Sequence, residues 1–257
     1  MLGRLADHSK PLPIVALYPT IQAEGSRAGH PTIIVRTTGC THRCYFGSGG
    51  WCDSWYTSIH PEKGRHSFQD VKALYADNCN IKDMTLTGGA PTMHPALVNE
   101  LMHFAHQHDL FVTLETEGSH FVATDYPINL LSISPKFSNS LPQVGMRTPL
   151  GQVVDARMIH QHNKYRLNLT VIRRMINTHQ DYHIKPVLDA ELTALDELED
   201  FLQQLQIPDD KVWVMPAGDS RAALMRAYGV VMNHARDRGW RFTPRPHIIA
   251  FDTERNV

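Results

Sequence analysis

Short runs of β-branched and aliphatic residues alternate with longer amphipathic stretches along most of this 257-residue chain. An alternation of this kind predicts a parallel sheet whose helices cross over between neighbouring strands. About six βα units can be counted, and Ser67 is well placed to cap the first helix. The predicted strands are residues 31–39, 84–87, 110–115, 130–134, 182–188 and 212–215. The predicted helices are residues 67–80, 94–108, 167–177, 192–205 and 221–238.

The composition fits one α/β domain covering residues 1–257. Hydrophobic residues make up 42% of the chain and charged residues 20%, which is enough to bury a core and excludes a disordered protein. The net charge of -1 provides no overall field for nucleic acid or for anionic lipid. The first residues, MLGRLADHSKPLP, lack the apolar stretch of a secretory signal, and no run is long enough to span a membrane. We therefore expect a cytoplasmic protein with no nucleic-acid or membrane partner.

Polar residues and glycines follow the ends of several predicted strands. In barrel-like parallel sheets the carboxyl ends of the strands form the rim that holds the active site. We expect the functional residues at this rim. The candidate segments there are Glu24, the cysteine loop at 40–52, Gly88-Gly89, Glu115, residues 134–136 and residues 215–216.

Three of the four cysteines, Cys40, Cys44 and Cys52, fall within thirteen positions. In a reducing compartment this spacing favours metal binding over disulfides, and we expect Cys79, which stands apart, to be a buried thiol. Three thiolates on a four-iron cluster leave one iron open to another ligand. A structural zinc site completed by His42 or His60 explains the spacing about equally well.

Several motifs resemble the radical S-adenosylmethionine enzymes that make 7-carboxy-7-deazaguanine. The segment IVRTTGCTHRCYFGSGGWCDS at 34–54 is similar to that family's FVRxxGCxxxCxxCD[ST] opening. Five further segments, between residues 15 and 257 and in the expected order, favour the cluster over zinc. They are YPTIQAEG at 18–25 (family FxSIQGEG), TGGAP at 87–91 (TGGEP), LETEG at 114–118 (LETNG), ISPK at 133–136 (SPK) and PRPHI at 244–248 (PRxHI).

The chain departs from the family pattern in two places. Seven residues rather than two separate the second and third cysteines, and the added segment 45–50 (YFGSGG) is rich in glycine, which tolerates tight backbone paths. We expect this segment to form a loop that bulges away from S-adenosylmethionine. Ala90 replaces the glutamate of the family's GGEP motif, so one polar contact to the cofactor is lost unless Glu115 or Glu117 supplies it.

The resemblance implies a set of site residues. Glu24 and Arg36 would be the catalytic pair, and a guanidinium such as that of Arg36 grips a carboxylate or a heterocycle edge with paired donors. Ser54 would bind Mg²⁺, and Cys40, Cys44 and Cys52 would hold a [4Fe-4S] cluster. The implied substrate-binding residues are Ile21, Gln22, Ala23, Glu24, Arg36, Thr87 and His247, the last of which we expect in a C-terminal strand. The implied S-adenosylmethionine-binding residues are Trp51, Cys52, Asp53, Gly89, Glu115, Ser134, Pro135, Lys136, Met215, Pro216, Ala217 and Gly218.

The resemblance also implies a fold, a reaction and partners. The fold would be an incomplete (β/α)6 barrel of the radical S-adenosylmethionine type. The reaction would convert 6-carboxy-5,6,7,8-tetrahydropterin to 7-carboxy-7-deazaguanine with release of ammonia, on a route to queuosine-type 7-deazapurines. An electron donor such as flavodoxin or ferredoxin would reduce the cluster, and a homodimer would cover the open seam of the barrel. The alternatives are another radical enzyme of this class, such as a glycyl-radical activase, and a non-catalytic metal-binding module.

Overall fold

A computed structural model describes residues 7–257 of the chain, so the first six residues of the predicted domain lie outside the described part. A six-stranded sheet runs in the order β1-β2-β3-β4-β5-β6, and a three-stranded sheet runs β7-β8-β9. Strand β1 pairs antiparallel with β2, and the neighbours from β2 to β6 pair in parallel. The strands are β1 (Ile14–Ile21), β2 (Pro31–Thr37), β3 (Asp83–Gly88), β4 (Phe111–Thr116), β5 (Leu130–Ile133), β6 (Tyr182–Ile184), β7 (Val187–Leu188), β8 (Trp213–Pro216) and β9 (Arg241–Phe242).

The two sheets continue one another through the segment around Lys185 and Pro186. Residues 182–188 were predicted as one strand, but the chain breaks there into β6 and β7, because a proline has no N–H to donate to a ladder. A parallel bridge between Ile184 and Val212 carries the pairing across the break. Within residues 7–257 no pairing joins β1 to β9, so the barrel-like sheet stays open on that side. The predicted α/β fold built around a parallel sheet is confirmed.

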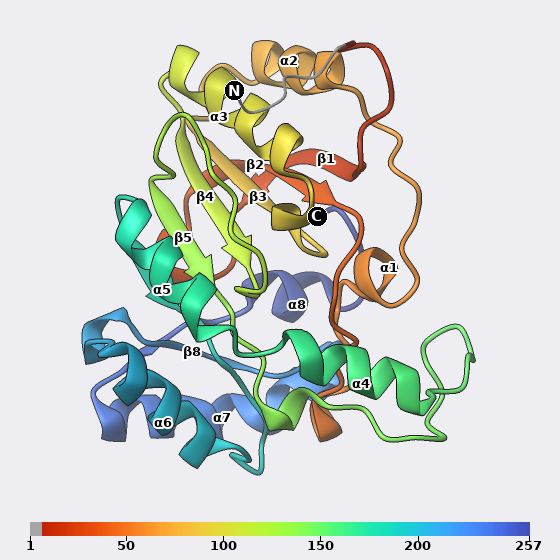
Figure 1. Cartoon of the computed structure of the whole chain (residues 1–257), viewed down its shortest axis with the longest axis vertical. Coiled ribbons are helices and arrows are strands. Elements are labelled where there is room, and N and C mark those ends of the chain that lie inside the picture. The colour runs from red at the N-terminus through yellow and green to blue at the C-terminus, as the bar shows by residue number, and fades with distance from the viewer. Residues whose placement is uncertain (1–6) are drawn as a thin grey trace.

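Helices pack on the outside of this sheet. Figure 1 shows α2 and α3 at one end of the molecule and α6 and α7 at the other, with the strands between them. No helix in the described part is both long and apolar enough to cross a lipid bilayer. The helices are α1 (Trp55–Ser58), α2 (Phe68–Asp77), α3 (Pro95–Gln107), α4 (Ala156–Tyr165), α5 (Leu169–Thr178), α6 (Leu195–Leu205), α7 (Arg221–Arg238) and α8 (Pro246–Phe251).

The buried core lies between the sheet and these helices. Val35, Leu86, Leu114 and Ile133 come from four successive parallel strands and belong to one apolar cluster with the helices' inner faces. The core therefore fixes the strands, and their carboxyl ends are left to form the site.

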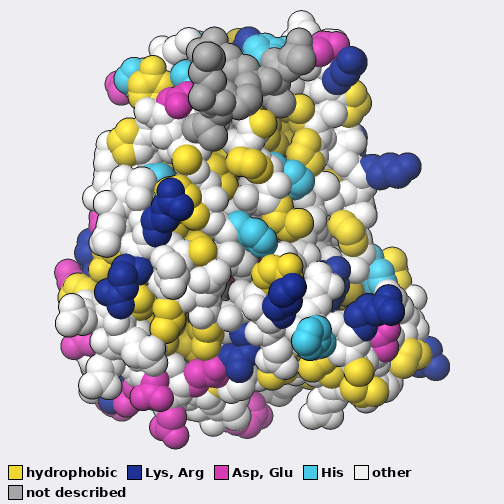
Figure 2. Space-filling model, viewed as in Figure 1, with side chains coloured by type: hydrophobic (Ala, Val, Ile, Leu, Met, Phe, Trp, Pro, Cys, Tyr) yellow, Lys and Arg dark blue, Asp and Glu magenta, His cyan; other side chains and the backbone are white. Residues whose placement is uncertain are grey.

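On the face drawn in Figure 2, acidic side chains gather along the edge where α6 and α7 lie in Figure 1, and basic side chains spread over the remainder.

Two expectations from the sequence are wrong. Cys79 is exposed rather than buried, because it lies in the turn that follows α2 and its C-cap residue Asn78. His247 lies in α8 rather than in a strand, since Pro246 occupies the first turn of that helix, where its missing N–H costs nothing.

The predicted cap of α2 is present and is reciprocal. The hydroxyl of Ser67 accepts a hydrogen bond from Asp70 N, and the carboxylate of Asp70 accepts one from Ser67 N at 2.7 Å. We predict that Ser67→Ala lowers the free energy of unfolding by about 1 kcal/mol, because Asp70 N loses its side-chain acceptor. Chemical denaturation measures this loss. The control is Gln69→Ala on the exposed surface of the same turn, and an equal loss in that variant would contradict the capping role.

Candidate active site at the carboxyl ends of the strands

A cavity of about 680 Å³ opens at the carboxyl-end rim of the sheet. It draws side chains from the segment after β1, the cysteine loop, the ends of β3, β4 and β5, and the segments after β8 and before α8. Three residues implied by the resemblance, Pro135, Pro216 and Ala217, do not line it. The implied residues that do line it are Ile21, Gln22, Ala23, Glu24, Arg36, Cys40, Cys44, Trp51, Cys52, Asp53, Ser54, Thr87, Gly89, Glu115, Ser134, Lys136, Met215, Gly218 and His247.

A small hairpin brings Cys44 and Cys52 side by side despite the seven residues between them. Cys52 N donates to Cys44 O at 3.0 Å, and an antiparallel bridge joins Tyr45 to Trp51. Cys40 approaches from the end of β2 and lines the same cavity. The added residues therefore lengthen the hairpin without separating the two cysteines at its base.

The hairpin tip packs against the start of α7. Asp219 N donates to Gly49 O at 2.9 Å, the carboxylate of Asp219 accepts from Trp51 N at 3.2 Å, and Arg226 donates to Ser48 O at 2.6 Å. Of residues 45–50, only Phe46 lines the cavity. The expectation that the whole segment bulges away is wrong for Phe46, because its ring packs with Met215 and Ala217 in a small apolar cluster.

The spacing of the cysteine side chains bears on the choice between zinc and a cluster. Zinc–sulfur bonds of about 2.3 Å place the ligands of one zinc ion about 4 Å apart. In the described part of the chain, the only group of three or more metal-binding side chains whose ligand atoms all lie within 4.8 Å is Glu24, Asp53 and His247. Cys40, Cys44 and Cys52 all line one cavity, and their sulfurs do not all lie within 4.8 Å of one another, so they are spread more widely than three ligands of one zinc ion.

Burial favours the neutral form of these thiols. It raises the pKa of Cys40 to about 12 and that of Cys52 to about 11. Binding of iron would displace these protons, because the thiolate is the form that ligates a metal. The three cysteines thus fit a [4Fe-4S] cluster in their number, placement and donor type.

A network of buried charges crosses the wall beside β4 and β6. Lys185, which follows β6, donates to Glu24 at 2.6 Å and to Glu115 at 3.0 Å, and Thr87 donates to Glu115 at 2.6 Å. Burial alone would raise the pKa of Glu24, but Lys185 and Arg245 outweigh it and hold that pKa well below its usual range. Glu24 is therefore an ionised carboxylate whose oxygens only accept hydrogen bonds.

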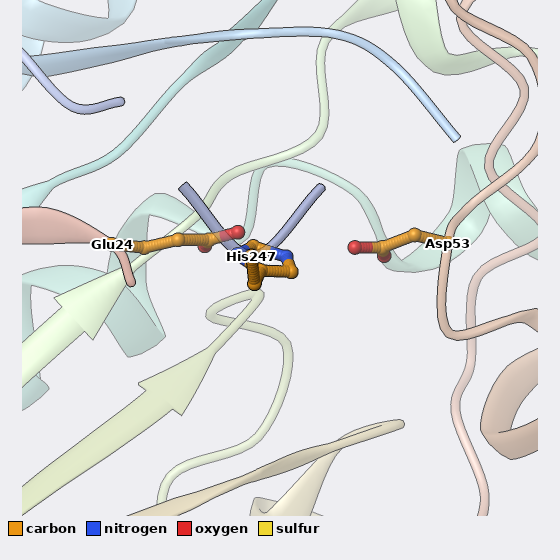
Figure 3. Close-up of side chains that lie close together, drawn as sticks. All are labelled: Glu24, Asp53 and His247. Carbon is orange, nitrogen blue, oxygen red and sulfur yellow. The ribbon is translucent and has the colours of Figure 1, made fainter. Parts of the chain in front are cut away.

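Arg245 lies between Glu24 and Asp53. Its guanidinium donates to Glu24 at 3.1 Å, to Gly218 O at 2.5 Å and to the carboxylate of Asp53. Figure 3 shows Glu24 and Asp53 reaching toward one another from opposite sides, with the His247 ring between them. Because a cation already bridges the two carboxylates, this group of three side chains needs no metal ion to offset its charge.

Arg36 and Ser54 form a second polar corner of the cavity. Arg36 donates to Ser54 Oγ at 3.0 Å and to the hydroxyl of Tyr18 at 3.3 Å. Ser54 Oγ can still offer a lone pair, and the half-exposed carboxylate of Asp53 is its chain neighbour. These oxygen donors fit Mg²⁺, which binds few protein ligands and keeps water or substrate oxygens in its shell.

The remaining polar side chains of the cavity differ in how many bonds they make. Lys136 donates to both the carbonyl and the hydroxyl of Ser134, at 2.6 and 2.7 Å. The side-chain oxygen of Gln22 accepts from Ala23 N at 2.8 Å. His247 Nδ1 is buried and has no hydrogen-bond partner in the described part of the chain. Burial lowers the pKa of His247, so a neutral imidazole with an unused nitrogen faces the cavity beside Glu24.

Among the cavity residues that reasoning from sequence missed are Lys185, Arg245 and Phe46. A signal existed for Lys185, since a lysine inside the otherwise apolar strand YHIKPVL is buried only when it is paired. Arg245 lies within the PRPHI segment, but nothing in the sequence indicates that it meets Glu24, which is 221 positions away. Phe46 belongs to the segment that the family pattern does not contain.

The fold and the site together define an α/β enzyme with an incomplete parallel barrel and a three-cysteine loop at its rim. Comparison with models of protein families gave no match. The chain is 32% identical over 247 residues to a 7-carboxy-7-deazaguanine synthase from Halobacterium salinarum, covering 94% of this chain and 91% of that protein. It is 30% identical over 238 residues to a 7-carboxy-7-deazaguanine synthase from Rhodopirellula baltica, covering 92% and 85%.

A solved structure shares the fold. The crystal structure of QueE from Escherichia coli matches with a TM-score of 0.55 and 20% identity, over 90% of this chain and 92% of that one. The chain therefore belongs to the 7-carboxy-7-deazaguanine synthase family, as the motifs indicated, and the predicted fold class is confirmed.

The hairpin offers a test with two glycines that differ in their surroundings. A Cβ at Gly50 would lie 2.0 Å from the carboxylate of Asp219, whereas one at Gly47 would meet nothing within 4 Å, although φ is positive at both. We predict that Gly50→Ala displaces the hairpin from α7 and lowers the iron bound per chain after anaerobic reconstitution. Gly47→Ala is the matched control and should keep its iron, and equal losses in both variants would show that backbone strain alone is responsible.

Proposed function

We propose that this chain converts 6-carboxy-5,6,7,8-tetrahydropterin to 7-carboxy-7-deazaguanine with release of ammonia. The observation that carries the proposal is the single cavity that gathers three cysteines, an ionised carboxylate at Glu24 and a guanidinium at Arg36. Membership of the family supports the same reaction, since the relatives are named for that product. The product belongs to a queuosine-type 7-deazapurine route.

The cofactors would be a [4Fe-4S] cluster, S-adenosylmethionine and Mg²⁺. Cys40, Cys44 and Cys52 would hold the cluster, and its fourth iron would bind S-adenosylmethionine for one-electron cleavage that starts the substrate radical chemistry. Gly89 lines the cavity with its backbone, and packing requires a glycine there, because a Cβ would lie 2.1 Å from Gly39 O and 2.7 Å from Thr57 O. Ser54 would contribute the protein oxygen to Mg²⁺.

The chain's own polar groups suit a carboxylated pterin. The ionised oxygens of Glu24 can accept from the N–H groups on the guanidine-like edge of the ring, and Arg36 can pair with an anionic oxygen. Arg36 lies in strand β2, and Glu24 follows β1, the antiparallel neighbour of β2. A ring held at both ends presents one face to the cysteine loop.

The partners also belong to the proposal. The enzyme would receive electrons from a small carrier protein such as flavodoxin or ferredoxin, work in the cytoplasm and form a homodimer across the open side of its barrel. Another radical enzyme of this class would also need the cysteine loop, but it would not need Gln22, Glu24 and Arg36 to face a heterocycle.

The proposed reaction is tested by anaerobic incubation of reconstituted protein with S-adenosylmethionine, a reductant and 6-carboxytetrahydropterin. We expect 7-carboxy-7-deazaguanine and 5′-deoxyadenosine by mass spectrometry. If 5′-deoxyadenosine forms without the deazaguanine, the enzyme class stands and the substrate is wrong. If one equivalent of zinc and no iron is bound, the radical chemistry is excluded.

The cysteine assignment is tested separately. We predict that Cys40→Ala, Cys44→Ala and Cys52→Ala each lose the brown absorbance of the reconstituted cluster, because two thiolates cannot hold four irons. Cys79→Ala is the matched control, since Cys79 is exposed and absent from the cavity lining. Full cluster content in Cys52→Ala together with its loss in Cys79→Ala would show that the ligand set is wrong.

A further inference from the structure

Glu24 has a cation bound to each of its two oxygens. Oε2 accepts from Lys185 Nζ at 2.6 Å and Oε1 accepts from Arg245 Nε at 3.1 Å. The side chains of Lys185 and Arg245 are only 4% and 5% exposed, so water cannot easily take their place. The carboxylate cannot rotate about its terminal bond without breaking one of the two contacts. Its remaining lone pairs are thus fixed in direction.

Each of these cations is itself held from another part of the fold. Lys185 also donates to Glu115 in β4 at 3.0 Å, and Arg245 donates to Gly218 O in the segment after β8 at 2.5 Å and to Asp53 in the cysteine loop. The contacts therefore run without a gap from β4 through Glu24 to the cysteine loop and β8. Of the side chains that hold Glu24 and its two cations, Lys185 lies outside the family motifs, whereas Arg245, Glu115 and Asp53 lie within them.

The charges of this network explain why both cations are required. Glu24 and Glu115 are both bound by Lys185, and without its ammonium two carboxylates would share a buried wall. Burial opposes the charge of Lys185, but Glu115 and Glu24 reverse that effect and raise its pKa above the usual value. Asp53 and His247 are the other titratable groups near Glu24, and Arg245 lies between Asp53 and Glu24. Removing Lys185 takes one of two cations from Glu24 and the bound cation from Glu115, and removing Arg245 takes the other cation from Glu24 and the bound cation from Asp53.

We propose that Lys185 and Arg245 are positioning residues that fix Glu24 as the acceptor for two adjacent N–H donors of the substrate's heterocycle. Arg245 also ties this acceptor to the segment at Gly218, which lines the part of the cavity that we assign to S-adenosylmethionine. The inference rests on the proposed function, because the pterin supplies the paired N–H donors. It specifies that substrates lacking either donor bind poorly even where their carboxylate is retained.

The first experiment compares Lys185→Met with Lys211→Met. Lys211 is a partly exposed lysine paired with Asp181 away from the cavity, and serves as the matched control. We expect Lys185→Met to raise KM for 6-carboxytetrahydropterin about 10- to 100-fold, the range for losing one charged hydrogen bond to the substrate-binding group. Lys185→Gln gives the same comparison if the methionine variant does not fold.

Binding of 6-carboxypterin, followed by quenching of tryptophan fluorescence, gives a readout that needs no turnover, because Trp51 and Trp55 line the cavity. A double-mutant cycle then separates positioning from general stability. In a Glu24→Gln background, Lys185→Met should cost little further affinity, since no charge remains to be fixed. Independent, additive losses in the cycle would overturn the positioning role.

Arg245 makes a second contact that distinguishes it from Lys185. We expect Arg245→Gln to weaken binding both of the pterin and of S-adenosylmethionine, because Gly218 O loses its donor, and Arg245→Lys to recover part of the pterin affinity only. The wild-type protein is assayed on the pterin first. If it does not convert the pterin, the proposed function is wrong. If it does, but the Lys185 and Arg245 variants keep the wild-type KM, the proposed function stands and the present inference is wrong.

Discussion

The ion network of Glu24, Lys185 and Arg245 is the interaction on which the arrangement of the rim depends. Its members come from opposite ends of the chain, and the network joins the antiparallel edge strand β1 to the segment that precedes α8. Within residues 7–257 no strand pairing closes the sheet between β1 and β9. A buried ion pair adds little to the free energy of folding, but it is tolerated only when its donors and acceptors are well aligned. That requirement specifies how the edge at β1 meets the segment before α8. The two edges of the open barrel therefore meet at the rim through this ion network and a hydrogen bond from Gly25 N to Thr243 Oγ1 at 2.6 Å, rather than through a backbone ladder.

The cysteine loop solves a different geometric problem with backbone hydrogen bonds. A hairpin makes the distance between its two base residues independent of its length, so Cys44 and Cys52 stay adjacent although the segment between them is longer than the family pattern. The tip then contacts Asp219 and Arg226 in the carboxyl-terminal half of the chain. The added residues thereby connect the cysteine loop to the wall that contains Gly218.

The sequence predicted the parallel strands and the helices of the outer layer well, because their apolar residues repeat with the period of the element. Strand β1 was not predicted, since its residues were interpreted only as part of the YPTIQAEG motif. Helix α4 was also missed. Its buried residue is His162, which accepts from Arg43 N at 3.0 Å in the cysteine loop, so the residue that α4 buries is polar rather than apolar. Contacts such as Glu24 with Arg245 depend on how the chain ends meet in space, which local pattern cannot encode.

Ala90 stands where the family's GGEP motif has a glutamate, so the acceptor oxygens of that glutamate are missing from this site. Glu115 and Glu117 are the two carboxylates that could replace them. The side chain of Ala90 is fully buried and absent from the cavity lining, while its N donates to Gly39 O at 2.7 Å, so this position contributes backbone alone. Glu115 has both oxygens bound, by Lys185 and by Thr87. Glu117 also lines the cavity, but its bonds from Thr41 and Thr116 are long, at 3.5 and 3.4 Å. Hydrogen bonds of that length hold an acceptor weakly. Of the two carboxylates near the cysteine loop, Glu117 is thus held by the longer hydrogen bonds, and more of its acceptor capacity is left for a ligand in the cavity.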